Sequence, residues 1–257
     1  MNTTPVKISA CIISFNEEKK IEDCIKSLLP VADEIIIVDS HSTDDTLNIA
    51  RQHTDKVYQH DFEGYGQQKN YALDQATNDW VISLDCDERL STELQSSILS
   101  IKDQLDSNTL YSMPRKTFYV YRWLNHCWYP DRKVRLFDKS KTLWQDNNVH
   151  ESIITGDMAT VKLSGDILHY SFDTISDHLK TIDKYTDIGA DDLISRNKSF
   201  NVFSPLTHAS WTFFRLYILK RGFLDGFAGL TVAVLSYMHV FIKYSKAIIK
   251  RKQKQSS

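Results

Sequence analysis

The first ninety residues alternate between short β-branched runs and amphipathic stretches, and this alternation limits the folds open to the chain. Residues 8–14, ISACIIS, are almost continuously apolar, as expected of a strand that is buried on both faces. Residues 17–29 then carry apolar side chains at helical spacing, and Pro30 follows them. Because the same order repeats, the sequence predicts an α/β fold with a Rossmann-like, doubly wound, mostly parallel sheet.

The later elements of this predicted sheet follow at short intervals. We expect further strands at 34–38, 57–58 and 80–84, and helices at 43–51 and 67–75. In doubly wound sheets, ligands bind beyond the carboxyl ends of the strands. Asn16, Asp39 and Asp85 each follow a predicted strand, so we expect them to converge on one crevice.

The pattern changes in the second half of the chain. Residues 110–150 are aromatic-rich and extended, and we expect them to complete the crevice. From residue 176 the pattern becomes helical, and it is strongly apolar after Pro205. The sequence therefore predicts an α/β domain over 1–175, which would carry the crevice, and a helical region over 176–257.

Composition and charge narrow the classes of partner. A 42% hydrophobic and 25% charged chain is typical of a globular protein, and a formal charge of -2 gives no reason to expect nucleic acid. The charge is uneven, because nine Lys and Arg residues from Arg215 onward face a single carboxylate, Asp225. We expect this basic end to meet an anionic surface.

Residues 223–242 are mostly apolar and about long enough to span a bilayer. They contain Asp225, and basic residues flank them on both sides, so we expect an interfacial helix on the inner face of the cytoplasmic membrane. In this arrangement the lysines of the C-terminal tail would meet anionic lipid. A core helix packed on the sheet is the alternative. Scattered cysteines and the lack of an N-terminal apolar run fit a cytoplasmic protein.

The segment Leu84-Asp85-Cys86-Asp87 directly follows a predicted buried strand. Two carboxylates at positions i and i+2 that leave a strand can both face a ligand once the chain turns. One can bind a hard divalent cation while the other accepts from a ribose hydroxyl or joins the coordination. An Asp-x-Asp pair also arises in ordinary surface turns, but its place after an apolar strand favours a functional site.

Six segments, SFNEE, IIVDSHSTDDT, GQQKNYAL, LDCDE, YPDRKVRLF and NVHES, occur in this order along the chain. Together they resemble glycosyltransferase family 2, whose members have the GT-A fold. Within that family the chain is similar to bacterial lipopolysaccharide core glucosyltransferases, over about residues 6 to 242. The resemblance implies UDP-glucose as the donor and a lipopolysaccharide core or similar glycolipid as the acceptor.

The same resemblance implies roles for single residues. Asn16 and Asp39 would contact the base and ribose of the nucleotide, and Lys69 and Asn70 the nucleotide or its diphosphate. Asp85 would lie on the ribose side. Asp87 would ligate Mn²⁺ or Mg²⁺. His169 is a second candidate ligand of that metal. The family often has Arg at the position of Lys69. Because Lys lacks the two-pronged guanidinium, a bidentate contact with the nucleotide or its diphosphate is not expected from Lys69.

The reaction also needs groups outside these motifs. Departure of a nucleoside diphosphate builds negative charge, and Arg135 in the segment DRKVR is a candidate to offset it. An inverting transfer needs a base within reach of the acceptor hydroxyl. Glu151, which follows His150, is the predicted base, and Asp131 is its reserve.

The sequence is also compatible with three other classes of protein. A non-catalytic nucleotide-binding domain has the same kind of sheet. A nucleotidyltransferase would normally carry a Gly-rich phosphate loop near the N-terminus, which this sequence lacks. A polyprenyl-phosphate glycosyltransferase is the nearest competitor, because a basic and apolar C-terminus suits a lipid carrier equally well.

Overall fold

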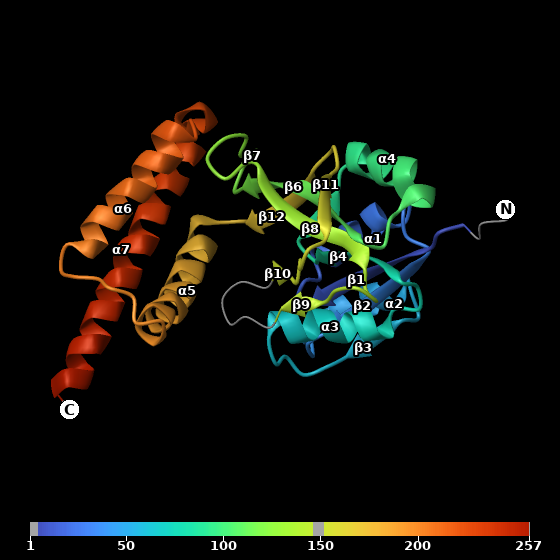
Figure 1. Cartoon of the computed structure of the whole chain (residues 1–257), viewed down its shortest axis with the longest axis horizontal. Coiled ribbons are helices and arrows are strands. Elements are labelled where there is room, and N and C mark those ends of the chain that lie inside the picture. The colour runs from blue at the N-terminus through green and yellow to red at the C-terminus, as the bar shows by residue number, and fades with distance from the viewer. Residues whose placement is uncertain (1–4, 146–151, 257) are drawn as a thin grey trace. The chain divides into compact units, whose positions relative to one another are not determined.

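A computed structural model describes residues 5–145 and 152–256 of the chain (Figure 1). It divides into two compact units. The first comprises Met1–Arg115 and Asp131–His169, and the second comprises Lys116–Pro130 and Tyr170–Ser257.

Strands and helices alternate in the first unit. The strands up to Leu90 are β1 (Ile8–Ser14), β2 (Glu34–Asp39), β3 (Val57–Gln59), β4 (Trp80–Asp85) and β5 (Glu88–Leu90). The helices are α1 (Ile21–Leu28), α2 (Thr46–Arg51), α3 (Tyr65–Gln75), α4 (Thr92–Ile101) and the short η1 (Lys102–Gln104). The later strands are β6 (Thr109–Tyr119), β7 (Arg122–Trp123), β8 (Asp131–Asp138), β9 (Trp144–Gln145), β10 (Ser152–Ile153), β11 (Ala159–Lys162) and β12 (Ile167–Phe172).

In the described residues, ten strands form one mixed sheet with the order β3-β2-β1-β4-β8-β6-β12-β5, and β7 and β11 pair with β6. The four N-terminal strands of this order are parallel. Their register pairs Ser14 with Asp39 and Ile13 with Asp85. The carboxyl ends of β1, β2 and β4 therefore lie at one edge of the sheet, as predicted.

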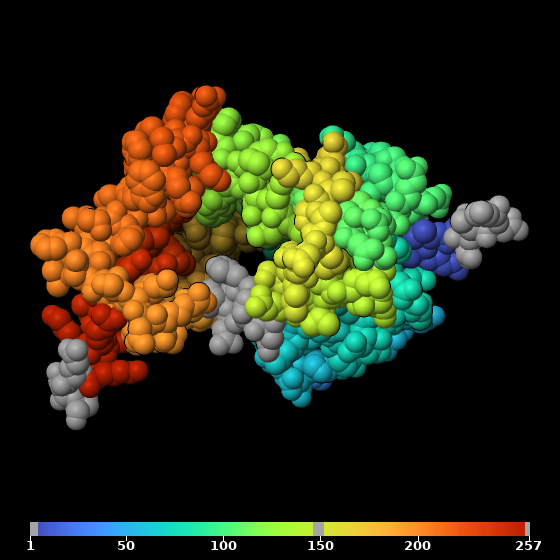
Figure 2. All heavy atoms as spheres, viewed as in Figure 1, coloured from blue at the N-terminus to red at the C-terminus, as the bar shows by residue number. Residues whose placement is uncertain are grey.

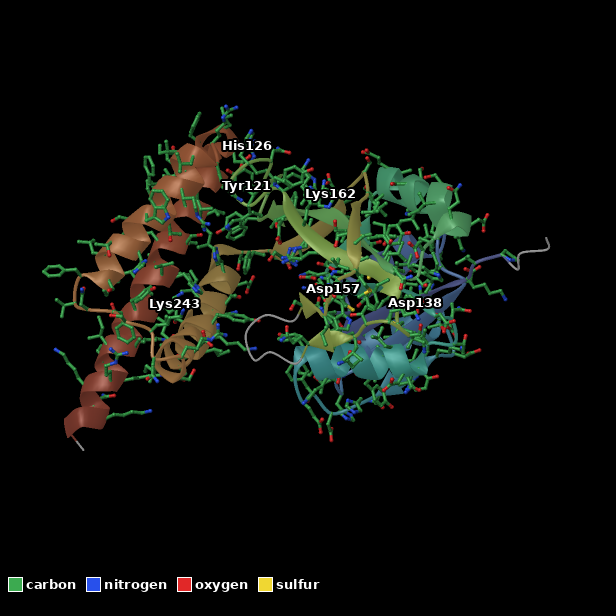
Figure 3. The ribbon with its side chains drawn as sticks, viewed as in Figure 1. Tyr121, His126, Asp138, Asp157, Lys162 and Lys243 are labelled. Atoms are coloured by element: carbon green, nitrogen blue, oxygen red, sulfur yellow. The ribbon has the colours of Figure 1, made fainter. Side chains whose placement is uncertain are left out.

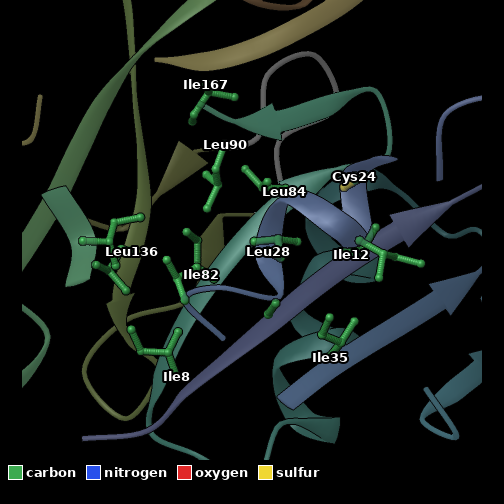
Figure 4. Close-up of a cluster of buried hydrophobic side chains, with 14 of the residues drawn as sticks. Ile8, Ile12, Cys24, Leu28, Ile35, Ile82, Leu84, Leu90, Leu136 and Ile167 are labelled. Atoms are coloured by element: carbon green, nitrogen blue, oxygen red, sulfur yellow. The ribbon is translucent and has the colours of Figure 1, made fainter. Parts of the chain in front are cut away.

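Both faces of the parallel strands are covered. In β1, Ile8, Ala10 and Ile12 enter a cluster with α1 (Figure 4). Cys11 enters a second cluster, with Ala72 of α3. Alternate side chains of a strand point to opposite faces of a sheet. The almost continuous apolar run of β1 therefore matches a strand that is buried on both faces. The predicted doubly wound fold is confirmed.

The antiparallel part of the sheet differs from the prediction. β8 pairs antiparallel with both β4 and β6. The sequence indicated only extended, aromatic-rich segments there, because irregular alternation does not show which strands pair. Two predicted helices also begin later than expected. The backbone N of Glu17 donates to Thr46 Oγ1 (2.8 Å), which holds the residues before α1 in a turn.

The second unit is mainly helical. Its helices are α5 (Ile175–Ser195), α6 (Ser204–Phe214), a π-helical turn η2 (Arg215–Leu219), a 3₁₀ turn η3 (Gly222–Asp225) and α7 (Gly226–Ser256). Figure 1 shows α6 and α7 as an antiparallel hairpin, with the turn between them at the end remote from the C-terminus. One described helix, Gly222–Lys254, is long and apolar enough to cross a membrane by length and composition.

The carboxylate of Asp225 joins the start of α7 to the loop that follows β7. It is fully buried, and it accepts hydrogen bonds from the backbone N of Asn125 (2.9 Å), His126 (3.0 Å) and Cys127 (3.0 Å). The Nδ1 atom of His126 lies 3.0 Å from the same carboxylate. Burial alone would raise the pKa of Asp225, but these donors hold it below its usual value. Asp225 is therefore an internal anchor of the second unit.

Helix α7 is also bound along its length to α5. Lys246 Nζ lies 2.7 Å from Asp187 and 3.1 Å from Asp183, and Lys250 Nζ lies 2.8 Å from Asp191. These three aspartates are spaced four residues apart, so they form an acidic stripe on one face of α5. Lys246 and Lys250 therefore pair with α5, and the expectation that the tail lysines meet a lipid surface stays a prediction.

We expect Asp225→Ala to lower the free energy of unfolding of the second unit by about 3 kcal/mol or more, because buried backbone N–H groups lose their acceptor. Urea and thermal unfolding followed by circular dichroism measure this change. Asp183→Ala is the matched control, because it removes an exposed carboxylate from the α5–α7 contact. Equal stability of the two variants would contradict the anchor role.

Candidate active site

The carboxyl end of β2 presents Asp39, which the sequence placed at the nucleotide. Its side chain is fully buried. Ser14 Oγ donates to Asp39 Oδ2 (2.9 Å), and the backbone N and the hydroxyl of Ser42 donate to the two carboxylate oxygens (2.7 and 2.5 Å). Asp39 thus fixes the loop after β2 against the end of β1.

Asn16 lies at the end of β1 and is exposed. Its backbone has a φ of 53°, a left-handed conformation that Asn tolerates better than most residues. Its Oδ1 accepts from Thr43 N (2.8 Å), and its backbone N donates to Ser42 Oγ (2.8 Å). Asn16 therefore joins the same loop from the exposed side, and the structure brings Asn16 and Asp39 to one place.

Helix α3 contributes Lys69 and Asn70. Lys69 is 1% exposed; its Nζ lies 2.8 Å from Asp85 Oδ1 and 4.5 Å from the ring centroid of Trp144. The amide of Asn70 donates to Trp144 O and accepts from Trp144 N, both at 2.9 Å. The Asn70 amide therefore holds Trp144 against the helix, and the indole lies beside the Lys69 ammonium.

Asp85 at the end of β4 is enclosed by cations. Arg135 of β8 donates to Asp85 Oδ2 (2.8 Å) and to both oxygens of Glu88 (2.9 Å each). Burial alone would raise the pKa of Asp85, but Lys69 and Arg135 hold it well below its usual range. Asp85 therefore stays ionised at physiological pH.

Glu88 is fully buried and is the acceptor that joins these groups. It accepts from Arg135, from Arg115 Nη1 (3.2 Å) and from the backbone N of Asp85 (3.1 Å). No role for Glu88, Arg115 or Trp144 was expected from the sequence. The signal for Glu88 was its place in the LDCDE motif. Its partners, Arg115 on β6 and Arg135 on β8, are distant in sequence; Arg135 was a candidate site residue, but its pairing with Glu88 gave no signal.

Asp131, the reserve candidate for the base, lies at the start of β8. Arg115 Nη2 lies 2.7 Å from its Oδ2, and Lys133 Nζ lies 3.3 Å from its Oδ1. Burial acts to raise the pKa of Asp131, but Arg115 and Lys133 lower it below its usual value. A carboxylate held in this way is a poor proton acceptor.

Asp87 differs from Asp85 in its surroundings. Cys86 between them is buried in the core cluster of α1, so the two aspartates flank an inward-pointing residue. Asp87 is half-buried, and its Oδ2 lies 3.1 Å from His169 Nε2 of β12. Among the described residues, the Nδ1 of His169 has no hydrogen-bond partner. The contact therefore suits an imidazole that donates through Nε2 and positions the Asp87 carboxylate.

These groups fit a hard divalent cation in part. Within the described ranges, no group of three or more His, Cys, Asp and Glu side chains could hold a metal. Asp87 offers a carboxylate whose oxygens suit Mn²⁺ or Mg²⁺, and such ions commonly complete their coordination with substrate phosphates and water. A site with few protein ligands therefore fits an ion that arrives with a diphosphate.

The predicted base, Glu151, lies outside the described residues, as does His150. Strands β9 and β10, which pair with each other, precede and follow this segment in the chain. All the other predicted site residues belong to the first unit.

We expect Glu88→Gln to destabilise the first unit by about 3–5 kcal/mol, because it breaks a buried ion pair and leaves the cations partly uncompensated. Urea unfolding measures the change. Glu93→Gln, an exposed residue in the first turn of α4, is the matched control and should unfold like the wild type. Equal stability of the two variants would show that the network does not depend on the Glu88 charge.

Comparison with known proteins assigns a family to this arrangement. The family model for glycosyl transferase family 2 matches residues 9–164. An uncharacterized glycosyltransferase of Rickettsia typhi is 31% identical over 257 residues, covering 93% of this chain and 86% of the relative. The lipopolysaccharide core biosynthesis glycosyltransferase LpsC of Rhizobium meliloti is 26% identical over 246 residues, covering 93% and 91%.

Among solved structures, S. aureus TarS 1–349 matches with 16% identity and a TM-score of 0.47 over 94% of this chain and 92% of that one. Another is glucosyl-3-phosphoglycerate synthase from Mycobacterium tuberculosis in complex with Mn²⁺ and UDP-glucose. It is 25% identical, with a TM-score of 0.34 over 44% of each chain. The family model covers more than half of the chain, and the mixed sheet with its covering helices has the GT-A arrangement. The chain therefore belongs to glycosyl transferase family 2.

Proposed function

We propose that this glycosyltransferase moves a hexose, glucose from UDP-glucose, onto a hydroxyl of a lipopolysaccharide core or similar glycolipid, with inversion. The observation that carries the proposal is the different surroundings of the two aspartates after β4. Asp85 is held between Lys69 and Arg135, whereas Asp87 contacts only the His169 imidazole among the contacts described. The likeness to LpsC over most of both chains supports this acceptor class.

Different residues of the chain would bind different parts of the nucleotide-sugar donor. The loop that Asp39 and Asn16 hold together would receive the base and ribose, with backbone and side-chain groups already in position. Lys69 and Arg135 are buried cations beside Asp85, and they would supply positive potential where the diphosphate leaves. Asn70 would act through Trp144, which it holds beside both cations.

A bound Mn²⁺ or Mg²⁺ would offset the charge that develops on the leaving diphosphate. Asp87 would hold this ion, and His169 would orient the Asp87 carboxylate or bind the ion directly. The acceptor hydroxyl needs a base, and we assign that role to Glu151. The paired state of Asp131 supports this choice, because its pKa is held below the usual value.

We place the protein peripherally on the inner face of the cytoplasmic membrane, where a glycolipid acceptor would be presented. Helix Gly222–Lys254 is apolar enough to cross a membrane. However, Asp225 lies within the apolar stretch 223–242 and accepts from the backbone of the 125–127 loop, and a crossing of this stretch would have to break these contacts or draw the carboxylate into lipid. These contacts support an interfacial arrangement.

The metal role has a direct test. Release of UDP from UDP-glucose by purified protein should require Mn²⁺ or Mg²⁺, should stop in excess chelator and should be absent in Asp87→Asn. The exposed Asp103→Asn is the matched control and should remain active. A screen of nucleotide sugars, with a lipopolysaccharide core or a polyprenyl phosphate as acceptor, separates the proposed function from its nearest competitor. Full activity in chelator would remove the metal from the mechanism.

The base assignment has a second test. Glu151→Gln keeps the side-chain size and removes the proton acceptor, so kcat should fall by roughly 10²- to 10⁴-fold while donor binding is retained. Asp131→Asn should affect stability more than kcat, because Arg115 loses one of its two carboxylate partners. If Asp131→Asn lowers kcat in this way and Glu151→Gln remains active, the two roles are exchanged.

A further inference from the structure

The turn between α6 and α7 presents an unusual amount of apolar surface to solvent. We call residues 214–227 the hairpin tip. Its exposed large apolar side chains are Phe214, Ile218, Leu219, Phe223, Leu224 and Phe227. Phe227 is 70% exposed, although it is among the largest apolar side chains of the chain. Contiguous exposed apolar groups of this size mark an interaction surface.

The charges of the hairpin tip have a single sign at the surface. Arg215, Lys220 and Arg221 are exposed. The one carboxylate in this range, Asp225, is fully buried, and its oxygens accept from the 125–127 loop. The Arg122 guanidinium adds a further cation beside the tip, since a Cβ on Gly226 would lie 2.9 Å from its Nη1. The surface therefore combines apolar side chains with uncompensated positive charge.

The structure of the tip is held by the protein itself. A Cβ on Gly222 would lie 2.7 Å from Leu216 O, and one on Gly229 would lie 1.9 Å from Gly222 O. These close approaches pack the two turns η2 and η3 against the start of α7. The exposed phenylalanines and leucines thus remain outside because the interior of the turn is already filled by backbone.

We propose that the hairpin tip inserts its apolar side chains into the surface of an anionic lipid bilayer, with Arg215, Lys220 and Arg221 at the headgroups. A convex end of a helical hairpin suits a fluid surface that adapts to it (Figures 1 and 2). Apolar groups bordered by cations match the boundary between acyl chains and anionic headgroups. The tail is less suited, because Lys246 and Lys250 are already paired with α5 and Lys243 lies over Gly189 (Figure 3).

This inference rests on the proposed glycolipid acceptor for its purpose, but its test needs neither donor nor acceptor. Flotation of the full-length protein with vesicles of phosphatidylcholine and phosphatidylglycerol measures binding. Leu219→Ser with Phe227→Ser should weaken binding by about tenfold or more for each side chain removed from lipid. Arg215→Glu with Lys220→Glu should weaken it by roughly fivefold or more per charge and should reduce its dependence on salt.

Two matched controls separate the tip from the rest of the hairpin. Val202→Ser with Phe203→Ser removes equally exposed apolar side chains at the opposite end of the hairpin, and Lys254→Glu reverses a charge of the tail. Both should bind like the wild type. All changed side chains are exposed, so the melting temperatures should agree.

A labelling measurement tests the same contact without removing it. The four cysteines of the chain, Cys11, Cys24, Cys86 and Cys127, are buried and free. An environment-sensitive fluorophore at Phe227→Cys should shift to the blue when anionic vesicles are added, and one at Val202→Cys should not. UDP release in the absence of vesicles should be the same for both labelled proteins, which reports on the transferase separately.

Several results would overturn the inference. Wild-type protein that does not float, or tip variants that float as well as the wild type, would exclude the tip as the contact. Loss of binding in Lys254→Glu alone would assign the contact to the tail. Protein that resists both high salt and alkaline carbonate would mean that α7 spans the bilayer. A dimer that the tip variants abolish, without vesicle binding, would assign the surface to a second copy of the chain.

Discussion

The buried charges at the carboxyl end of β4 determine how the candidate site is built. Glu88, which is fully buried, joins Arg135 and Arg115, while Asp85 lies between Arg135 and Lys69. These side chains come from a helix and from parallel and antiparallel strands, so their pairing fixes the antiparallel half of the sheet against the parallel half. A buried ion that loses its partner is costly, and this cost makes the arrangement specific.

One consequence is that the two aspartates of the Asp-x-Asp motif cannot have the same role. Asp85 compensates buried cations, and its pKa is held well below the usual range. Among the ion pairs described, Asp87 has the His169 imidazole and no Lys or Arg, although its side chain is about as exposed as that of Asp85 (24% and 25%). The cations that we propose for the leaving group and the carboxylate that we propose for the metal thus lie beside one strand end.

In the second unit, burial of the Asp225 carboxylate leaves positive charge at the surface. The carboxylate of Asp225 is buried and accepts from backbone N–H groups of the 125–127 loop. The cations of the hairpin tip are exposed, so the surface of the tip is positive. The acidic stripe of α5 neutralises Lys246 and Lys250 at the other end of α7. Within residues 214–227, the exposed charges are therefore Arg215, Lys220 and Arg221, with no exposed carboxylate beside them.

The sequence by itself determined the parallel, doubly wound half of the fold, because apolar runs such as residues 8–14 and the helices between them are local patterns. It also determined that Asn16, Asp39 and Asp85 follow neighbouring strands, and the motifs identified the family. Only the tertiary structure decided which charges pair. Glu88 meets Arg115 and Arg135, and Asp225 meets residues 125–127, across long separations in the chain. Such pairings depend on strand order and helix packing, which local periodicity does not encode, and the ion pairs of Asp131, Lys246 and Lys250 are further examples.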